Sequence, residues 1–207
     1  MDQSSKVEKK YDRIAGLYDL LTSGNEKRRF SSWRKNFISP LKGNILEIGI
    51  GTGKSIKYYN ENCKLLGIDI SEKMLQRAKE RLAESGRANI TLKQMNAENL
   101  DLENDSFDYV VTSCVFCSVP DPVKGLKEIR RVLKPSGKLI MMEHVLSKNA
   151  LIALIEHINN PITKLLTGIN INRDTRQNVV NAGMKITDEK NLAFFDVFKL
   201  FVAEKNG

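Results

Sequence analysis

A glycine-rich segment is the first feature of the chain whose residue types could do chemistry. Glu47, Gly49, Gly51 and Gly53 form the pattern E-x-G-x-G-x-G, directly after an apolar run at residues 45–48 and before an expected helix. Glycines in such a place let the backbone approach a ligand closely and adopt dihedral angles that other residues avoid. The segment indicates a loop that cradles a ligand, although a glycine turn without any ligand would have the same composition.

Two known phosphate-binding motifs partly match this segment, and both fail at one position. The dinucleotide fingerprint G-x-G-x-x-G fails because Lys54 occupies the place of its third glycine. The nucleoside triphosphatase loop G-x-x-x-x-G-K-[ST] fits Gly53, Lys54 and Ser55, but Ile48 stands where its first glycine belongs. A nucleotide-binding protein of another kind is therefore the disfavoured reading.

Polar residues also come directly after the second, third and fourth apolar runs of the chain. Asp69 ends the run at residues 64–69, 22 residues after Glu47. Its carboxylate could accept hydrogen bonds from both hydroxyls of a ribose, or it could simply cap a helix. Two further polar features, the segment 96–98 and Ser113, come after the third and fourth apolar runs. Together these features predict one ligand site at successive strand ends.

The glycine spacing, followed by these polar positions, resembles the class I S-adenosylmethionine-dependent methyltransferases. The resemblance implies S-adenosylmethionine as cofactor and S-adenosylhomocysteine as product. In that family the loop holds the methionine and ribose portions and the acid binds the ribose, while Asn96 stands where the family often has aspartate. The cofactor-binding residues that the resemblance implies are Tyr11, Tyr18, Glu47, Gly49, Gly51, Gly53, Asp69, Ile70, Met74, Asn96, Ala97, Glu98 and Ser113.

A closer resemblance concerns the methyl acceptor. Residues 11–19 read Y-D-x-x-A-x-x-Y-D, similar to quinone C-methyltransferases and bacterial phospholipid N-methyltransferases. Segments 117–122, 128–137 and 172–175 are similar to the phospholipid enzymes, and they also occur in microsomal methyltransferase-like proteins that act on small thiols. The resemblance implies a phosphatidylethanolamine headgroup, or its methylated derivatives, as acceptor. A soluble thiol S-methyltransferase or quinone C-methyltransferase is the alternative.

Two side chains are candidates for a catalytic role. Methyl transfer from a sulfonium is an in-line displacement, so the protein chiefly aligns donor and acceptor. The Tyr18 ring could cover the sulfonium by cation–π attraction, or belong only to an apolar stripe. His144 could accept a proton, or be a structural histidine. Cys114 and Cys117 lack a second cysteine pair, so they predict buried thiols and no metal site.

Alternating apolar runs and amphipathic segments must position these residues. From residue 44 onward they predict an α/β fold: a Rossmann-like, doubly wound, seven-stranded and mostly parallel sheet, with helices on both faces and an antiparallel final strand. Ser71 is the expected N-cap of the helix that follows the second strand. Ligands in such folds bind at the carboxyl ends of the strands. Expected strands cover 45–48, 64–69, 90–94, 107–113, 138–145, 184–187 and 194–203, with a turn at 134–137.

We expect one methyltransferase domain over residues 1–207. It would consist of an N-terminal amphipathic segment (1–43), a cofactor-binding core (44–147) and an acceptor-side helical insertion (148–175). The insertion is expected to be helical from Leu151 to Ile158 and to end near Pro161. Its apolar side chains would either pack on the sheet or cover the acceptor pocket.

Composition limits the remaining possibilities. The 207 residues are 41% hydrophobic and 28% charged, as expected for a soluble globular domain. Apolar runs are too short for a membrane-spanning helix, the first residues do not resemble a signal peptide, and three cysteines are too few for a disulfide framework. We therefore expect a cytoplasmic protein that is a monomer or weak dimer.

The positive charge is concentrated near the N-terminus. The net charge is +8, of which +5 falls in residues 1–44, +1 in residues 45–147 and +2 in the remainder. Lys9, Lys10 and Arg13 flank a stripe that runs from Val7 to Leu21. This predicts either an anionic membrane contact through residues 6–35, peripheral to the inner membrane face, or a lid over the cofactor. Nucleic acid is not expected, because residues 113–116 do not form the Asn-Pro-Pro-aromatic loop used for base amines.

Overall fold

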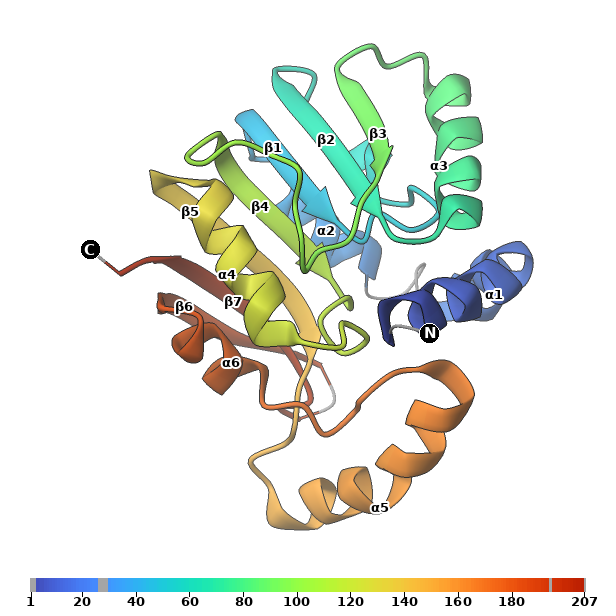
Figure 1. Cartoon of the computed structure of the whole chain (residues 1–207), viewed down its shortest axis with the longest axis vertical. Coiled ribbons are helices and arrows are strands. Elements are labelled where there is room, and N and C mark those ends of the chain that lie inside the picture. The colour runs from blue at the N-terminus through green and yellow to red at the C-terminus, as the bar shows by residue number, and fades with distance from the viewer. Residues whose placement is uncertain (1–2, 26–29, 194, 207) are drawn as a thin grey trace.

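The chain builds one seven-stranded sheet with the strand order β3-β2-β1-β4-β5-β7-β6 (Figure 1). The computed structural model describes residues 3–25, 30–193 and 195–206, and the side chains of residues 21–25, 166 and 167 lie outside that description, as do Arg28 and Arg29. Strands β1 to β5 pair in parallel, and β7 runs antiparallel to both β5 and β6. The predicted doubly wound, mostly parallel sheet is confirmed.

The elements have the following bounds. The strands are β1 Gly43–Ile48, β2 Cys63–Asp69, β3 Ile90–Gln94, β4 Phe107–Ser113, β5 Leu133–His144, β6 Met184–Ala193 and β7 Phe198–Lys205. The helices are α1 Gln3–Asn25, α2 Ser31–Phe37, α3 Glu72–Ser85, α4 Pro122–Val132, α5 Ala150–Thr167 and α6 Thr175–Asn181, with a short 3₁₀ helix, η2, at Ile56–Tyr58.

Hydrophobic clusters cover both faces of the sheet. One cluster joins Leu126 and Ile129 of α4 with Val179 of α6. The other joins Leu75 of α3 with Ile38, just beyond α2. Figure 1 shows α4 and α6 in front of the sheet and α2 behind it. The central strands read as continuous apolar runs because both of their faces are buried.

Strand register gathers the predicted site residues at one edge. Ile48 of β1 lies beside Ile68 of β2 and beside Thr112 of β4. The glycine loop, Asp69 and Ser113 each come next after one of these positions, so three neighbouring strands deliver them to the same place. The following helix is fixed there by its predicted cap, since the Ser71 Oγ accepts a hydrogen bond from the Met74 amide at 3.1 Å.

Four local predictions were wrong. The glycine loop leads into the short 3₁₀ helix η2, which ends where Tyr59 adopts an extended backbone and Arg87 donates hydrogen bonds to the Ile56 and Tyr59 carbonyl oxygens. The expected turn at 134–137 lies within β5, whose pairing with β4 continues through an irregularity. Strand β6, at the edge of the sheet, extends to Ala193, because its backbone pairs with β7 along its length and an exposed edge strand needs no apolar pattern. Strand β7 begins at Phe198, the partner of Ala193.

The fourth correction concerns α5, which continues through Pro161 to Thr167. A proline removes one backbone donor and usually ends or kinks a helix. Here the end of the helix is held from outside, because the Lys10 ammonium donates to the Lys164 and Leu165 carbonyl oxygens, each at 2.9 Å. Figure 1 shows α1 and α5 at the carboxyl end of the sheet, apart from its two covered faces.

The described residues include no helix that is both long enough and apolar enough to cross a bilayer.

Candidate active site

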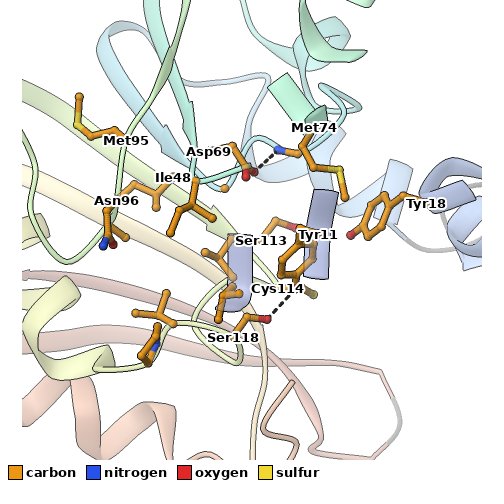
Figure 2. A pocket seen from close by; sticks show the side chains of 18 residues that line it. Tyr11, Tyr18, Ile48, Asp69, Met74, Met95, Asn96, Ser113, Cys114 and Ser118 are labelled. Carbon is orange, nitrogen blue, oxygen red and sulfur yellow. Dashed lines mark hydrogen bonds between the residues drawn. The ribbon is translucent and has the colours of Figure 1, made fainter. Parts of the chain in front are cut away.

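A pocket opens at the carboxyl ends of β1, β2 and β4, beneath α1 (Figure 2). Figure 2 shows Tyr11 and Tyr18 of α1 on one side, and Ile48, Asp69 and Asn96 from the strand ends on the other. The lining residues are Val7, Tyr11, Tyr18, Ile48, Gly49, Gly51, Asp69, Ile70, Met74, Met95, Asn96, Ala97, Ser113, Cys114, Val115, Ser118, Val119 and Pro120.

The glycine loop bends along the wall of this pocket. Gly49 and Gly51 have φ angles of 70° and 57°, which side chains with a Cβ rarely adopt. A Cβ on Gly49 would lie 2.3 Å from a methyl carbon of Val115, whereas a Cβ on Gly51 would meet nothing within 4 Å. Gly49 is therefore required by packing, and Gly51 exposes its backbone to the space where a ligand would lie.

Asp69 connects the glycine loop to the start of α3. One carboxylate oxygen accepts a hydrogen bond from the Gly51 amide and the other from the Ser71 amide, each at 2.9 Å. Burial raises the pKa of Asp69 to about 6, although these two hydrogen bonds oppose the shift. The group is thus ionised at neutral pH, and each oxygen keeps a lone pair that could accept a ligand hydroxyl.

Ser113 presents an unsatisfied hydroxyl at the end of β4. Its Oγ is buried, lines the pocket and makes no hydrogen bond within the described part of the chain. Buried polar atoms are nearly always hydrogen-bonded, so an orphan of this kind needs an explanation. A polar ligand group in the pocket would supply the missing partner.

The two tyrosines of α1 remain neutral phenols. Burial raises the pKa of Tyr18 to about 12 and that of Tyr11 further above its usual range. The Tyr11 and Ser118 hydroxyls are 2.7 Å apart. The Lys54 ammonium lies 5.6 Å from the centre of the Tyr18 ring, so this ring already attracts a cation. Neither phenol is suited to act as a phenolate base at neutral pH.

The aspartates that follow these tyrosines attach α1 to the domain. Asp12 accepts hydrogen bonds from the Ser71 hydroxyl at 2.6 Å and from the Lys73 amide at 3.3 Å. Asp19 accepts from the Thr52 hydroxyl at 2.7 Å and from Arg81 at 2.9 Å. Sequence reasoning gave these aspartates no role. The signal was the Tyr-Asp pair repeated seven residues apart, which turns each tyrosine to the pocket and each aspartate to its rim.

Comparisons with known proteins agree with this geometry. The family described as "Methyltransferase domain" matches residues 46–141. A phosphatidylethanolamine N-methyltransferase of Cereibacter sphaeroides is 32% identical over 154 residues, which cover 72% of this chain and 73% of the relative. The chain belongs to the S-adenosylmethionine-dependent methyltransferases.

Two further comparisons mark the breadth of the family. A demethylmenaquinone methyltransferase of Shouchella clausii is 30% identical over 68% of this chain, which spans 63% of that relative, slightly less than two thirds of its length. A methyltransferase of Haloferax volcanii, solved with the Trm112 methyltransferase activator, superposes with a TM-score of 0.75 at 18% identity, covering 95% of this chain and 98% of the other. This structural similarity supports the fold that is described above for this chain.

Ten of the residues predicted to bind the cofactor line the pocket, and three do not. Glu47 is buried below the glycine loop, where it accepts a hydrogen bond from the Ser55 hydroxyl at 2.6 Å, and burial raises its pKa to about 7. Gly53 packs against α3, since a Cβ there would lie 3.1 Å from Ala78. Glu98 accepts from the Ser4 hydroxyl at 3.3 Å and from the Asp121 amide at 2.7 Å. These three residues support the pocket from outside its wall.

His144 also lies outside the pocket lining of this methyltransferase. Its Nε2 is 3.7 Å from a carboxylate oxygen of Glu156 in α5, and its ring packs edge-on against Phe198 with 5.2 Å between ring centres. Burial lowers the pKa of His144, which favours the neutral imidazole. A catalytic role for His144 stays a prediction, and the contacts observed here join the end of β5 to α5.

The loop after β4 contributes pocket residues that sequence reasoning did not assign. Cys114 and Ser118 line the pocket, and burial raises the pKa of the Cys114 thiol well above its usual value. The buried Glu143 supports this loop by accepting hydrogen bonds from the Thr112 hydroxyl at 2.8 Å and from the Val115 amide at 3.2 Å. The motif at residues 117–122 was the available signal, but it suggested a family and gave no contacts.

Arg173 supports the same loop from behind. Its guanidinium donates to the Val119 carbonyl oxygen at 3.0 Å, and Val119 lines the pocket. Within the described residues, no cluster of three or more His, Cys, Asp or Glu side chains is arranged to hold a metal ion.

Proposed function

We propose that this methyltransferase N-methylates the amino headgroup of phosphatidylethanolamine, or its methylated derivatives, at the cytoplasmic face of a membrane. The observation that carries the acceptor class is the similarity, over 72% of the chain, to a phosphatidylethanolamine N-methyltransferase. The repeated Tyr-Asp pattern in α1 fits this acceptor and fits the quinone enzymes equally, so the choice of a phospholipid rests on the alignment.

The residues around the pocket fit S-adenosylmethionine. Asp69 would accept the ribose hydroxyls, and Ile70 and Met74 would border the adenine. The exposed backbone at Gly51 and the orphaned hydroxyl of Ser113 suit the polar methionine end. When bound, the cofactor supplies a methyl group made electrophilic by its sulfonium.

The protein's contribution to the reaction is alignment and charge stabilisation. An acceptor nitrogen held beside Tyr18 would take up the methyl group through its lone pair, the carbon–sulfur bond would break to leave a neutral thioether, and positive charge would pass from sulfur to nitrogen. The face of the neutral Tyr18 ring can stabilise this positive charge by cation–π attraction, without any proton transfer. The Tyr18 hydroxyl can hold the acceptor. The ammonium form of the acceptor has no lone pair, so it must lose its proton before the attack.

A second candidate function is C-methylation of a quinone precursor. The 30% identity to a demethylmenaquinone methyltransferase favours it, since that relative aligns with 68% of the chain. Both candidates use the same cofactor pocket and differ only in the acceptor.

A labelled-methyl transfer assay separates them. The protein is given methyl-labelled S-adenosylmethionine with detergent-dispersed phosphatidylethanolamine, its monomethyl derivative, a demethylmenaquinone analogue or a panel of small thiols. Label in methylated phosphatidylethanolamine is the expected result. Label confined to the quinone or to a thiol would overturn the proposed acceptor, and an Asp69→Asn variant controls for a contaminating activity.

A further inference from the structure

Helix α5 exposes an apolar stripe along its length. Its side chains at spacings of three and four are exposed by 53–77%: Leu151, Leu154, Ile155, Ile158, Ile162 and Leu165. Ten large hydrophobic residues are strongly exposed in the described part of the chain, and these six belong to one helix. The stripe does not pack on the sheet, so that expectation was wrong. None of its residues lines the pocket, and a role in covering the acceptor stays a prediction. A concentration of this kind marks an interaction surface.

The polar side of α5 faces the protein instead. Glu156 is 6% exposed, and its carboxylate accepts a hydrogen bond from the Ser147 amide at 2.9 Å. One turn further on, the Asn160 side chain accepts from the Ile171 amide at 2.9 Å. A surface helix normally turns its apolar face to the core. These inward polar contacts fix α5 in the opposite orientation, so its stripe points away from the molecule.

The position of α5 connects the stripe to the pocket. The Lys10 ammonium of α1 donates to the Lys164 and Leu165 carbonyl oxygens near the end of α5. Just after α5, the backbone N–H of Asn170 donates to the Cys117 carbonyl oxygen at 2.8 Å. Cys117 belongs to the loop that lines the pocket through Cys114 and Ser118. Figure 1 shows α5 at the same end of the molecule as α1. Whatever covers the stripe therefore lies near the acceptor side of the site.

The charge around the stripe identifies its partner. Lys148 precedes α5 and Lys164 lies near its end, both exposed, and the acidic residue of the helix, Glu156, is turned inward. Lysines at the margins of an apolar helix face suit an anionic bilayer surface. A two-fold contact between two copies would pair the helix with itself and bring these lysines together in an antiparallel arrangement, so a second copy is disfavoured.

We propose that α5 is an in-plane membrane-docking helix that inserts its apolar stripe into the headgroup region of an anionic phospholipid bilayer. This role rests on the lipid acceptor of the proposed function, because docking presents the acceptor side of the pocket to lipid headgroups. It also refines the expected membrane contact at residues 6–35. Val7, Tyr11 and Tyr18 of α1 line the pocket, while Leu17 and Leu20 of that helix are exposed. Among the described residues, the larger exposed apolar surface therefore lies on α5.

Vesicle flotation of the full chain, without cofactor, tests the docking helix. The vesicles contain either equal parts phosphatidylglycerol and phosphatidylcholine or phosphatidylcholine alone. The variant Leu154→Gln/Ile158→Gln should partition at least about tenfold more weakly than wild type onto the anionic vesicles. Val180→Gln, which changes an exposed apolar residue of α6, should float like wild type. Unchanged circular-dichroism melting curves establish that the variants are folded.

A charge-reversal pair provides the second arm. Lys148→Glu/Lys164→Glu should weaken flotation, whereas Lys42→Glu/Lys64→Glu, at exposed positions near the start of β1 and in β2, should have little effect. Equal loss in both variants would overturn the proposal, since the bilayer would then respond only to net charge. Flotation unaffected by the α5 substitutions would also overturn it. So would a dimer, seen by sedimentation without vesicles, that the Leu154→Gln/Ile158→Gln variant loses.

Activity on a monomeric substrate separates this inference from the proposed function. Short-chain phosphatidylethanolamine, used below its micelle concentration, needs no docking and should be methylated equally by wild type and by Leu154→Gln/Ile158→Gln. No methylation of that lipid, with flotation still dependent on α5, would remove the proposed acceptor and support the docking helix. Methylation of that lipid, with flotation independent of α5, would keep the acceptor and overturn the docking helix.

Discussion

At the residue scale, Asp69 is the side chain on which the cofactor assignment depends most. Both of its oxygens already accept backbone hydrogen bonds, and a ribose would use the remaining lone pairs. Asp69→Asn replaces one acceptor by an NH₂ group, so we expect the affinity for S-adenosylhomocysteine to fall about tenfold or more. Isothermal titration calorimetry measures this. Asp101→Asn, a matched change at an exposed ion pair with Lys93, should bind like wild type, and equal affinities for all three proteins would contradict the assignment.

Tyr18 permits a test that separates its ring from its hydroxyl. If the ring stabilises the charge that moves during methyl transfer, Tyr18→Phe should retain kcat within about threefold. Tyr18→Leu keeps apolar bulk but loses the π face, and kcat should fall about tenfold or more. Single-turnover rates with saturating cofactor are the measurement. A Tyr18→Leu enzyme as fast as Tyr18→Phe would reduce Tyr18 to a packing residue.

Glu143 links the site to the pH dependence of stability. Burial raises its pKa from 4.5 to about 7, so the folded state holds this proton more tightly than the unfolded state. The resulting stabilisation is complete below pH 4.5 and is lost as pH rises to about 7. Glu143→Gln keeps the acceptor for Thr112 and removes the titration. At pH 8 it should be more stable than wild type by about 2–3 kcal/mol, and the difference should shrink towards pH 5.

Urea unfolding of both proteins at several pH values measures that difference directly. Comparing the two proteins is necessary because the pKa values of Asp19, Asp108 and Glu189 are lowered, and their contributions are lost in the opposite direction, as pH falls. A stability difference that does not change with pH would show that Glu143 is not the titrating group.

At the element scale, α1 is held over the pocket by polar contacts along its length. Asp19 joins the helix to the glycine loop through Thr52 and to α3 through Arg81. Asp19→Asn should loosen this attachment by about 1–2 kcal/mol and weaken cofactor binding with it. Hydrogen exchange in α1 together with the binding constant reports the effect. Glu8→Gln, at an exposed contact of the same helix with Gln94, should leave both unchanged. Faster exchange without weaker binding would show that α1 does not retain the cofactor.

The elements also show what the sequence could predict. The strand ends that carry the glycine loop, Asp69 and Ser113 were predicted because buried parallel strands are apolar and their polar successors must lie at one edge. The orientation of α5 was not predictable from its periodicity. A stripe of apolar residues shows that a helix is amphipathic, but only the tertiary contacts of Glu156 and Asn160 decide which face turns inward.

The contacts of the residues behind the pocket wall could not be predicted from the sequence, for a related reason. Glu47 and Glu98 were predicted to bind the cofactor because they belong to motifs, and this stays a prediction. In the structure neither lines the pocket, and they accept hydrogen bonds from Ser55 and Asp121. A motif fixes which residues occur together in the chain. The side-chain rotamer, which decides whether a residue faces the ligand or its neighbours, depends on packing that spacing alone does not encode.

At the scale of the whole molecule, charge and apolar surface meet at the end that carries the pocket. Lys148 and Lys164 flank the exposed stripe of α5, and that stripe is joined to α1 through Lys10. Attraction between exposed lysines and an anionic bilayer is screened over about 10 Å at 0.1 M salt and about 3 Å at 1 M. Docking should thus depend on salt, while the chemistry in the pocket should not.

This gives a prediction for the intact enzyme. Raising salt from about 0.05 to 0.5 M should reduce the methylation rate on anionic vesicles containing phosphatidylethanolamine severalfold, because the enzyme leaves the surface. The rate on monomeric short-chain phosphatidylethanolamine should change by less than about twofold. Parallel initial-rate measurements with both substrates, at one cofactor concentration, test it. Equal inhibition on both substrates would place the salt effect in the pocket, and equal insensitivity would mean that surface charge does not bring this enzyme to its acceptor.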